Sequence, residues 1–231
     1  SQPVRDNAIY VMGDALSKIR ELEFPVELND TTRAFFNGVG KARHDATGDA
    51  MIAIAADPAD KRSEALMNQD KMLHSMLRTT CVATLIEGGH ALNALPQKVT
   101  ANVNCRMFPG HTEEETRQAL VAAIGNPAVG VAINPPEKPV AKVPPLDPAI
   151  VGPMIAISEK YFPGVPVVPN MSTGATDGLY LSAVGIPTYG VPGLWTDPDF
   201  NGMHGLNERM EVLGLYTGRD YLTELVKAYT R

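Results

Sequence analysis

Basic clusters and long apolar runs are absent from this chain of 231 residues. Lysine and arginine form no cluster and the formal net charge is -6, which argues against nucleic acid as a partner. No apolar stretch approaches the roughly 20 residues that span a bilayer, so no membrane segment is expected. Hydrophobic residues make up 44% of the chain, an ordinary value for one large globular domain or two small ones.

Cysteine is scarce, since Cys81 and Cys105 are the two cysteines of the whole sequence. They do not form a C-x-x-C pair, and both fall in segments with the pattern of strands. Because free cysteine behaves as a small buried apolar residue, two separate thiols in the core are the expected arrangement. A disulfide or a metal site is the alternative.

Complete motifs for hydrolytic chemistry are also missing. No His-x-Asp pair and no Glu-Glu pair follows a strand, although a catalytic zinc needs about three protein ligands and an open position. His204 still resembles a ligand, because glycines flank its loop and Asn207 and Glu208 can hydrogen-bond to it. A surface histidine is the alternative. Ser172 lacks the G-x-S-x-G pattern, which disfavours a serine hydrolase.

Helical patterns dominate the first part of the chain. Apolar residues recur at helical spacing over 6–20, and irregular helical patterns cover an insertion at about 28–76. Thr112 and Glu115 have the spacing of a capping box, and Gly125 is placed to end the helix that follows. The acidic residues between them are interpreted as favourable first-turn charges and not as a general base.

Strands are expected at 79–87, 98–108 and 129–133. The second of these alternates, with valine, alanine and cysteine on one face and Thr100, Asn102, Asn104 and Arg106 on the other. One face should therefore pack on helices while the other offers polar groups. The order of elements indicates an α+β domain, with helices covering one face of an antiparallel sheet.

The pattern changes after a proline-dense stretch at 135–148, which is interpreted as a connection between domains. Beyond it, helices are expected at 149–161, 178–184 and 213–229, and strands at 166–169 and 186–191. Helices and strands of this kind are typical of an α/β domain, but two strands are too few to complete its sheet. The predicted domains are residues 1–138 and 139–231.

Two groups of residues are candidates for binding an anion. Arg106 can hold a carboxylate through two parallel hydrogen bonds, and a surface salt bridge is the alternative. The small residues from Thr173 and Gly174 to Asp177 precede a helix, where free backbone amides suit an anion. A plain helix cap by Thr176 or Asp177 is the other interpretation of this loop.

Taken in order, four motifs resemble the second half of the dinuclear-zinc peptidases that include aminoacylase, glutamate carboxypeptidase and succinyl-diaminopimelate desuccinylase (metallopeptidase family 20). The motifs are Gly89-x-x-x-Asn93-x-x-Pro96, Asn104-x-Arg106-x-x-Pro109-Gly110, Thr173-Gly174-x-Thr176-Asp177 and His204-Gly205-x-Asn207-Glu208. The insertion and Arg78-Thr79-Thr80 look closest to the branch of carboxypeptidase S and the N-acyl-amino-acid hydrolases.

This resemblance implies an α/β protein, in which an α+β lid or dimerisation domain precedes the C-terminal part of a zinc-peptidase catalytic domain. His204 matches the last zinc ligand. Asn93 and Arg106 match lid residues that hold the substrate, in some relatives within a neighbouring subunit's site. Thr173, Gly174 and Asp177 match a loop that lines the pocket near the substrate carboxylate.

The resemblance also implies an activity, namely hydrolysis of an amide bond next to a free carboxylate in a short peptide or N-acyl amino acid. Two zinc ions would act in the intact enzyme, with the site incomplete in this chain. The other ligands and the general-base glutamate are expected upstream of Ser1, in a missing N-terminal half, so this chain alone is expected to be inactive. A homodimer formed through the lid is expected. A non-catalytic dimerisation module is the alternative, and the compartment stays open.

Overall fold

The chain folds into two compact units in a computed structural model that describes residues 6–191, 193–194, 202 and 205–230. The first unit runs over Ser1–Val143 and Pro169–Ile186. The second unit runs over Pro144–Val168 and Pro187–Arg231. None of the described helices combines the length and the apolarity that crossing a bilayer requires.

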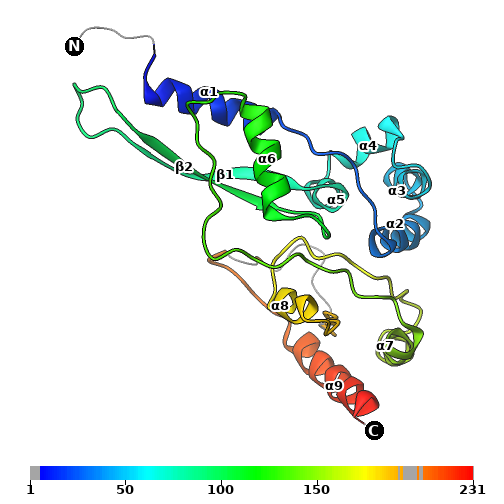
Figure 1. Cartoon of the computed structure of the whole chain (residues 1–231). Helices are drawn as coiled ribbons and strands as arrows, with labels where there is room; N and C mark the ends of the chain where they lie inside the picture. The colour runs from blue at the N-terminus through cyan, green and yellow to red at the C-terminus, as the bar shows by residue number, and fades with distance from the viewer. Residues whose placement is uncertain (1–5, 192, 195–201, 203–204, 231) are drawn as a thin grey trace. The chain divides into compact units, whose positions relative to one another are not determined.

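A two-stranded antiparallel sheet lies at the centre of the α+β part of the first unit (Figure 1). Strand β1 (Thr80–Gly88) pairs with β2 (Val99–Arg106), and the helices α1 (Ala8–Glu21) and α6 (Glu113–Ile124) pack together. The core between the sheet and these helices is formed by Ala15, Ile19, Leu120 and Ile124, with Cys81, Val103 and Cys105 packed against them. The expected fold class, mixed helices with a small antiparallel sheet, is confirmed.

The helix ends follow the sequence closely. The side chain of Asn7 accepts hydrogen bonds from the first amides of α1, as an N-cap residue does. Thr112 and Glu115 form the expected capping box of α6, and Gly125 ends that helix with a left-handed φ of 58°. Glycine adopts this conformation without the clash of a Cβ atom, which explains its place here.

The insertion consists of four helices, α2 (Asp30–Arg43), α3 (Ala46–Ala56), α4 (Lys61–Met67) and α5 (Lys71–Leu77), within the described residues. Its fully buried apolar side chains are those of Phe36, Met51, Ile54, Met67, Met76 and Leu77. Helices therefore occupy the segment at about 28–76 over which the sequence has helical patterns.

A buried ion pair joins the end of the insertion to its middle. Arg78, immediately before β1, has a side chain that is 3% exposed and pairs with Glu64 of α4, whose side chain is 8% exposed. The same guanidinium donates to the backbone oxygen of Phe24 at 3.1 Å. Lys61 adds a further contact to Glu64 at 2.7 Å, from a side chain that is 81% exposed. The charge of Arg78 is therefore compensated inside the protein.

The second unit contains two packed helices, α7 (Pro148–Tyr161) and α9 (Val212–Tyr229). Ile157, Tyr221 and Leu225 form their shared core. Helix α8 (Gly178–Ala183), with six residues, belongs to the first unit. All three helices were expected from the sequence.

Three predicted strands do not form in the described chain, and the expectation of strands at 129–133, 166–169 and 186–191 is wrong. A strand exists only where a neighbour accepts and donates its backbone hydrogen bonds. In 129–133, the backbone oxygen of Val131 instead accepts from Arg117 at 3.5 Å, and Val129 and Val131 pack by their side chains on the core. The two later segments are extended and have no partner strand among the described residues.

The expectation of two free thiols is also wrong. Cys81 and Cys105 face each other in the register of β1 and β2 and form a disulfide. Both residues are half-buried, and their Cα atoms are 4.1 Å apart. The reason is geometric, because the antiparallel register places the two side chains opposite each other on the same face of the sheet.

Candidate functional site

The outward face of the β1–β2 hairpin has the polar surface that the sequence predicts. The odd positions of β2 from Val99 to Cys105 are half-buried, whereas Thr100, Asn104 and Arg106 are exposed. Asn102 is half-buried on the same face, because it donates to Thr84 at 2.6 Å and accepts from Asn134 at 3.0 Å. This face offers hydrogen-bonding groups along the length of one strand.

Arg106 stands at the end of β2, opposite Thr80. Its side chain is exposed and makes no hydrogen bond or ion pair in the part of the chain that the structure describes. The chain immediately beyond is fixed, since the amide of Phe108 donates to the hydroxyl of buried Thr79 at 2.9 Å. The guanidinium is thus presented from a supported backbone, as recognition of a carboxylate requires.

Asn93 lies far from Arg106 within one chain. It is exposed in the turn that joins the strands after the Gly88–Val99 pair, whereas Arg106 belongs to the opposite end of the ladder (Figure 1). Seven residue steps along β2 amount to about 23 Å at the usual strand rise. One small substrate therefore cannot touch both side chains of the same chain.

The loop before α8 is organised by its own side chains. The amide of Gly174 donates to the hydroxyl of Ser172 and the amide of Gly178 to that of Thr176, each at 3.2 Å. Asp177 occupies the N-cap position without a side-chain hydrogen bond to the helix. Thr173, Gly174 and Asp177 are all exposed. The loop leaves these groups accessible, although two of its amides already have partners.

One contact ties this loop to the helical insertion, and the sequence alone gave no signal of it. The side-chain amide of Asn29 lies 3.8 Å from the sulfur of Met171, two residues before Thr173. The side-chain oxygen Oδ1 of Asn29 accepts from the backbone amide of Thr32 in a capping box at the start of α2. Since the cap fixes the orientation of the Asn29 amide, the insertion supports the loop from a defined position.

His111, which follows the base of the hairpin, links the segment before α2 to the start of α6. The Nε2 atom of His111 lies 2.7 Å from Glu27, and Nδ1 lies 3.5 Å from Glu115. The hydrogen bond with Glu27 is the main reason that the pKa of His111 is raised. This imidazole therefore becomes charged more readily than a solvated one and holds the start of α6 against the segment before α2.

His204, the expected zinc ligand, lies outside the described residues. Among the residues that are described, no group of three or more His, Cys, Asp or Glu side chains is placed to hold a metal ion. The described part of the chain therefore does not fit a complete zinc site.

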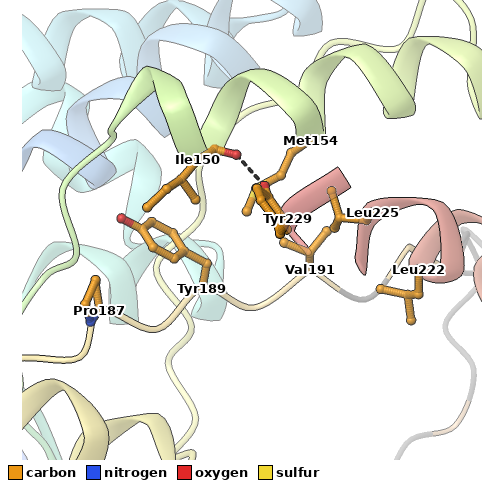
Figure 2. A pocket seen from close by; sticks show the side chains of 8 residues that line it. All are labelled: Ile150, Met154, Pro187, Tyr189, Val191, Leu222, Leu225 and Tyr229. Carbon is orange, nitrogen blue, oxygen red and sulfur yellow. Dashed lines mark hydrogen bonds between the residues drawn. The ribbon is translucent and has the colours of Figure 1, made fainter. Parts of the chain in front are cut away.

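An apolar cavity of about 400 Å³ occurs in the second unit, between α7, α9 and residues 187–191 (Figure 2). It is lined by Ile150, Met154, Pro187, Tyr189, Val191, Leu222, Leu225 and Tyr229, and the hydroxyl of Tyr229 donates to the backbone oxygen of Ile150. No candidate site residue lines it. The cavity therefore carries none of the polar chemistry expected from the sequence.

The polar hairpin, the arginine at its base and the helices on its other face agree with the comparison of this chain with known families. The chain belongs to the family of the M20 peptidase dimerisation domain, whose pattern matches residues 2–132. Among curated proteins it is similar to the N-fatty-acyl-amino acid synthase/hydrolase PM20D1 of mouse, with 24% identity over 165 residues, and of human, with 25% over 164.

These matches cover 70% of this chain and 33% of each relative, so the chain spans about a third of the length of its curated relatives. In fold, it resembles the M20 family metallo-carboxypeptidase Sso-CP2 from Sulfolobus solfataricus, with a TM-score of 0.61 at 18% identity. That alignment covers 97% of this chain and 53% of the other. The expected family is confirmed, and its relatives are hydrolases and peptidases by name.

Proposed function

We propose that the intact protein hydrolyses an amide bond next to a free carboxylate, in a short peptide or an N-acyl amino acid. The observation that carries this proposal is Arg106, an exposed guanidinium on a supported backbone at the end of a polar strand face. Such a group binds a carboxylate through two parallel hydrogen bonds and fixes the neighbouring amide in one orientation. The names of the relatives, an N-acyl-amino acid hydrolase and a carboxypeptidase, support this substrate class.

The proposed roles follow the domains predicted from the sequence and not the two compact units, because Pro169–Ile186 belongs to the first unit. Residues 1–138 would act as the lid, with Arg106 and Asn93 holding substrate, and residues 139–231 would belong to the catalytic domain. Thr173, Gly174 and Asp177 would line the pocket near the carboxylate. Zinc, the expected cofactor, supplies a bound water of lowered pKa in such enzymes. The described residues assemble no ligand set, and His204 would be one of the zinc ligands.

The distance between Asn93 and Arg106 supports a dimeric site. If both contact one substrate, the hairpin tip of one subunit must reach the site that contains the partner's hairpin base. The test is subunit mixing with full-length protein. Asn93→Ala and Arg106→Ala should each abolish most activity. When equal amounts of the two variants are dissociated and allowed to reassociate, half of the dimers contain one subunit of each variant, and one of the two sites in such a dimer is intact. The mixture should therefore recover about a quarter of the wild-type activity. No recovery on mixing would exclude the shared site.

Zinc dependence has a separate test. Hydrolysis of N-acyl amino acids by full-length protein should be lost on chelation and restored by zinc, and His204→Ala should prevent that restoration. Activity that survives in His204→Ala would contradict the assignment of His204 as a ligand.

A second candidate is a non-catalytic dimerisation module, favoured by the open edges of the two-stranded sheet. Unpaired strand edges are templates for association with another chain. Light scattering with size-exclusion chromatography on residues 1–231 should then show a dimer, and calorimetry should show no zinc binding. A monomer in solution would rule this candidate out.

A further inference from the structure

The disulfide at the base of the hairpin lies one residue pair from the proposed carboxylate anchor. Cys81 is opposite Cys105, and the next pair in the ladder is Thr80 with Arg106. Arg106 is therefore held from two sides, by the covalent link at Cys105 and by the buried contact of Phe108 with Thr79 beyond it.

Burial supports β1 weakly beyond Cys81, whereas Val103 of β2 is half-buried against the core. Val82, Leu85 and Ile86 are 60%, 67% and 61% exposed, so burial contributes little along β1. The ladder is also interrupted between Ala83 and Leu85. A two-stranded sheet with so little buried surface is marginally stable by itself. A covalent link across it restricts the unfolded hairpin and favours the paired state.

The two cysteines are partly exposed to solvent. Both cysteines are half-buried at the margin of the core that includes Ala15 and Leu120, and the strands around them are mostly exposed. Thiol–disulfide exchange needs access to at least one sulfur atom, and partial burial permits it.

We propose that Cys81 and Cys105 form a reversible redox site that positions Arg106 for carboxylate binding. The oxidant is a small-molecule disulfide such as oxidised glutathione. In the reaction, the two protein thiols and one glutathione disulfide give the intrachain disulfide and two glutathione thiols. The protein sulfurs are oxidised, the glutathione sulfurs are reduced, and the two thiol hydrogens end on glutathione. Cys81 and Cys105 are positioning residues, and this role rests on the proposed function of Arg106.

The test uses full-length protein equilibrated at several ratios of reduced to oxidised glutathione. Each sample is quenched with an alkylating reagent, and its mass is measured by mass spectrometry. After the quench, Cys81 and Cys105 should each carry one alkyl group in reduced protein and none in oxidised protein, and the proportion should reverse with the ratio. Hydrogen exchange of the β2 amides near Arg106 should accelerate about tenfold on reduction. The double variant Cys81→Ala/Cys105→Ala is the matched control, and its exchange should not respond to the ratio.

Kinetics then test the positioning role. Reduction should raise KM for a carboxylate substrate about fivefold and leave kcat within about twofold, since the anchor holds substrate without joining the bond-breaking step. Thiols that stay alkylatable in oxidised glutathione, or β2 exchange that is unchanged by reduction, would overturn the proposal. Faster exchange with unchanged KM would overturn the positioning of Arg106. If no redox state hydrolyses the substrate, the proposed function fails, and the exchange measurement alone decides the redox site.

Discussion

Replacing Glu64 by glutamine tests the buried ion pair that joins α4 to the start of β1. The substitution keeps the shape of the side chain and removes its charge, which leaves the guanidinium of Arg78 buried at 3% exposure. The remaining carboxylate near Arg78 belongs to Glu23, which is 70% exposed and lies 3.7 Å away. Breaking one side of a buried pair costs about 3–5 kcal/mol, because the surviving charge lacks compensation.

The free energy of unfolding should be measured by urea titration, followed by circular dichroism of the helices. Lys61→Met is the matched control, since it removes an exposed contact to the same carboxylate and should cost less than about 1 kcal/mol. The double variant Glu64→Leu/Arg78→Leu should lose less than Glu64→Gln, because no charge then stays buried. Equal losses for Glu64→Gln and Lys61→Met would refute this account of the pair.

The pH dependence gives a second measurement of the same interaction. Hydrogen bonding from Lys61, followed by that from Arg78, lowers the folded-state pKa of Glu64 from its ordinary value of 4.5. A carboxyl group with a lowered folded pKa stabilises the protein above its unfolded pKa, and this contribution is lost as the pH falls through the folded value. The stability difference between wild type and Glu64→Gln should therefore be full at neutral pH and should shrink below pH 4.5.

Two further changes test the packing and the titration of the first unit. The pKa of His111 is raised mainly by its hydrogen bond with Glu27. The stability that His111 contributes is therefore full below about pH 6.5 and is lost as the pH rises through the folded-state pKa. The melting temperatures of wild type and His111→Gln should converge over that rise in pH, and a constant difference between them would contradict the link to Glu27. Gly40→Ala should destabilise the protein by about 1–3 kcal/mol, because its Cβ would lie 2.8 Å from the backbone oxygen of Gly48. Gly13→Ala, with open space around it, should be neutral or stabilising in the same denaturation assay.

Local signals in the sequence were sufficient to predict the helices. The capping box of Thr112 and Glu115 and the left-handed Gly125 each depend on residues a few positions apart. The alternation along β2 also identified its buried face correctly, since that face needs no knowledge of the partner strand. These features could be predicted because the interactions that stabilise them are short-range in the chain.

Features that depend on distant partners could not be predicted in this way. Residues 186–191 have the apolar run of a buried strand, but a strand requires a neighbour that sequence patterning cannot supply. The disulfide depends on the register of two strands that are 24 residues apart at Cys81 and Cys105. The candidate residues Asn93 and Arg106 could be selected from sequence, but only the register of the hairpin shows that the length of β2, about 23 Å, lies between them.

The irregularity at Thr84 determines where strand β1 can lose one residue without losing its pairing with β2. Ala83 pairs with Val103 and Leu85 with Asn102, so Thr84 is an extra residue, and the facing of side chains reverses after it. Deleting Thr84 would give a regular ladder with every later side chain still on its present face, at the loss of one hydrogen bond to Asn102. Deleting a residue of β1 that does not adjoin Thr84 would turn the stretch between the deletion and Thr84 to the other face of the sheet. Natural variants that are one residue shorter in this strand should therefore have their gap at this position.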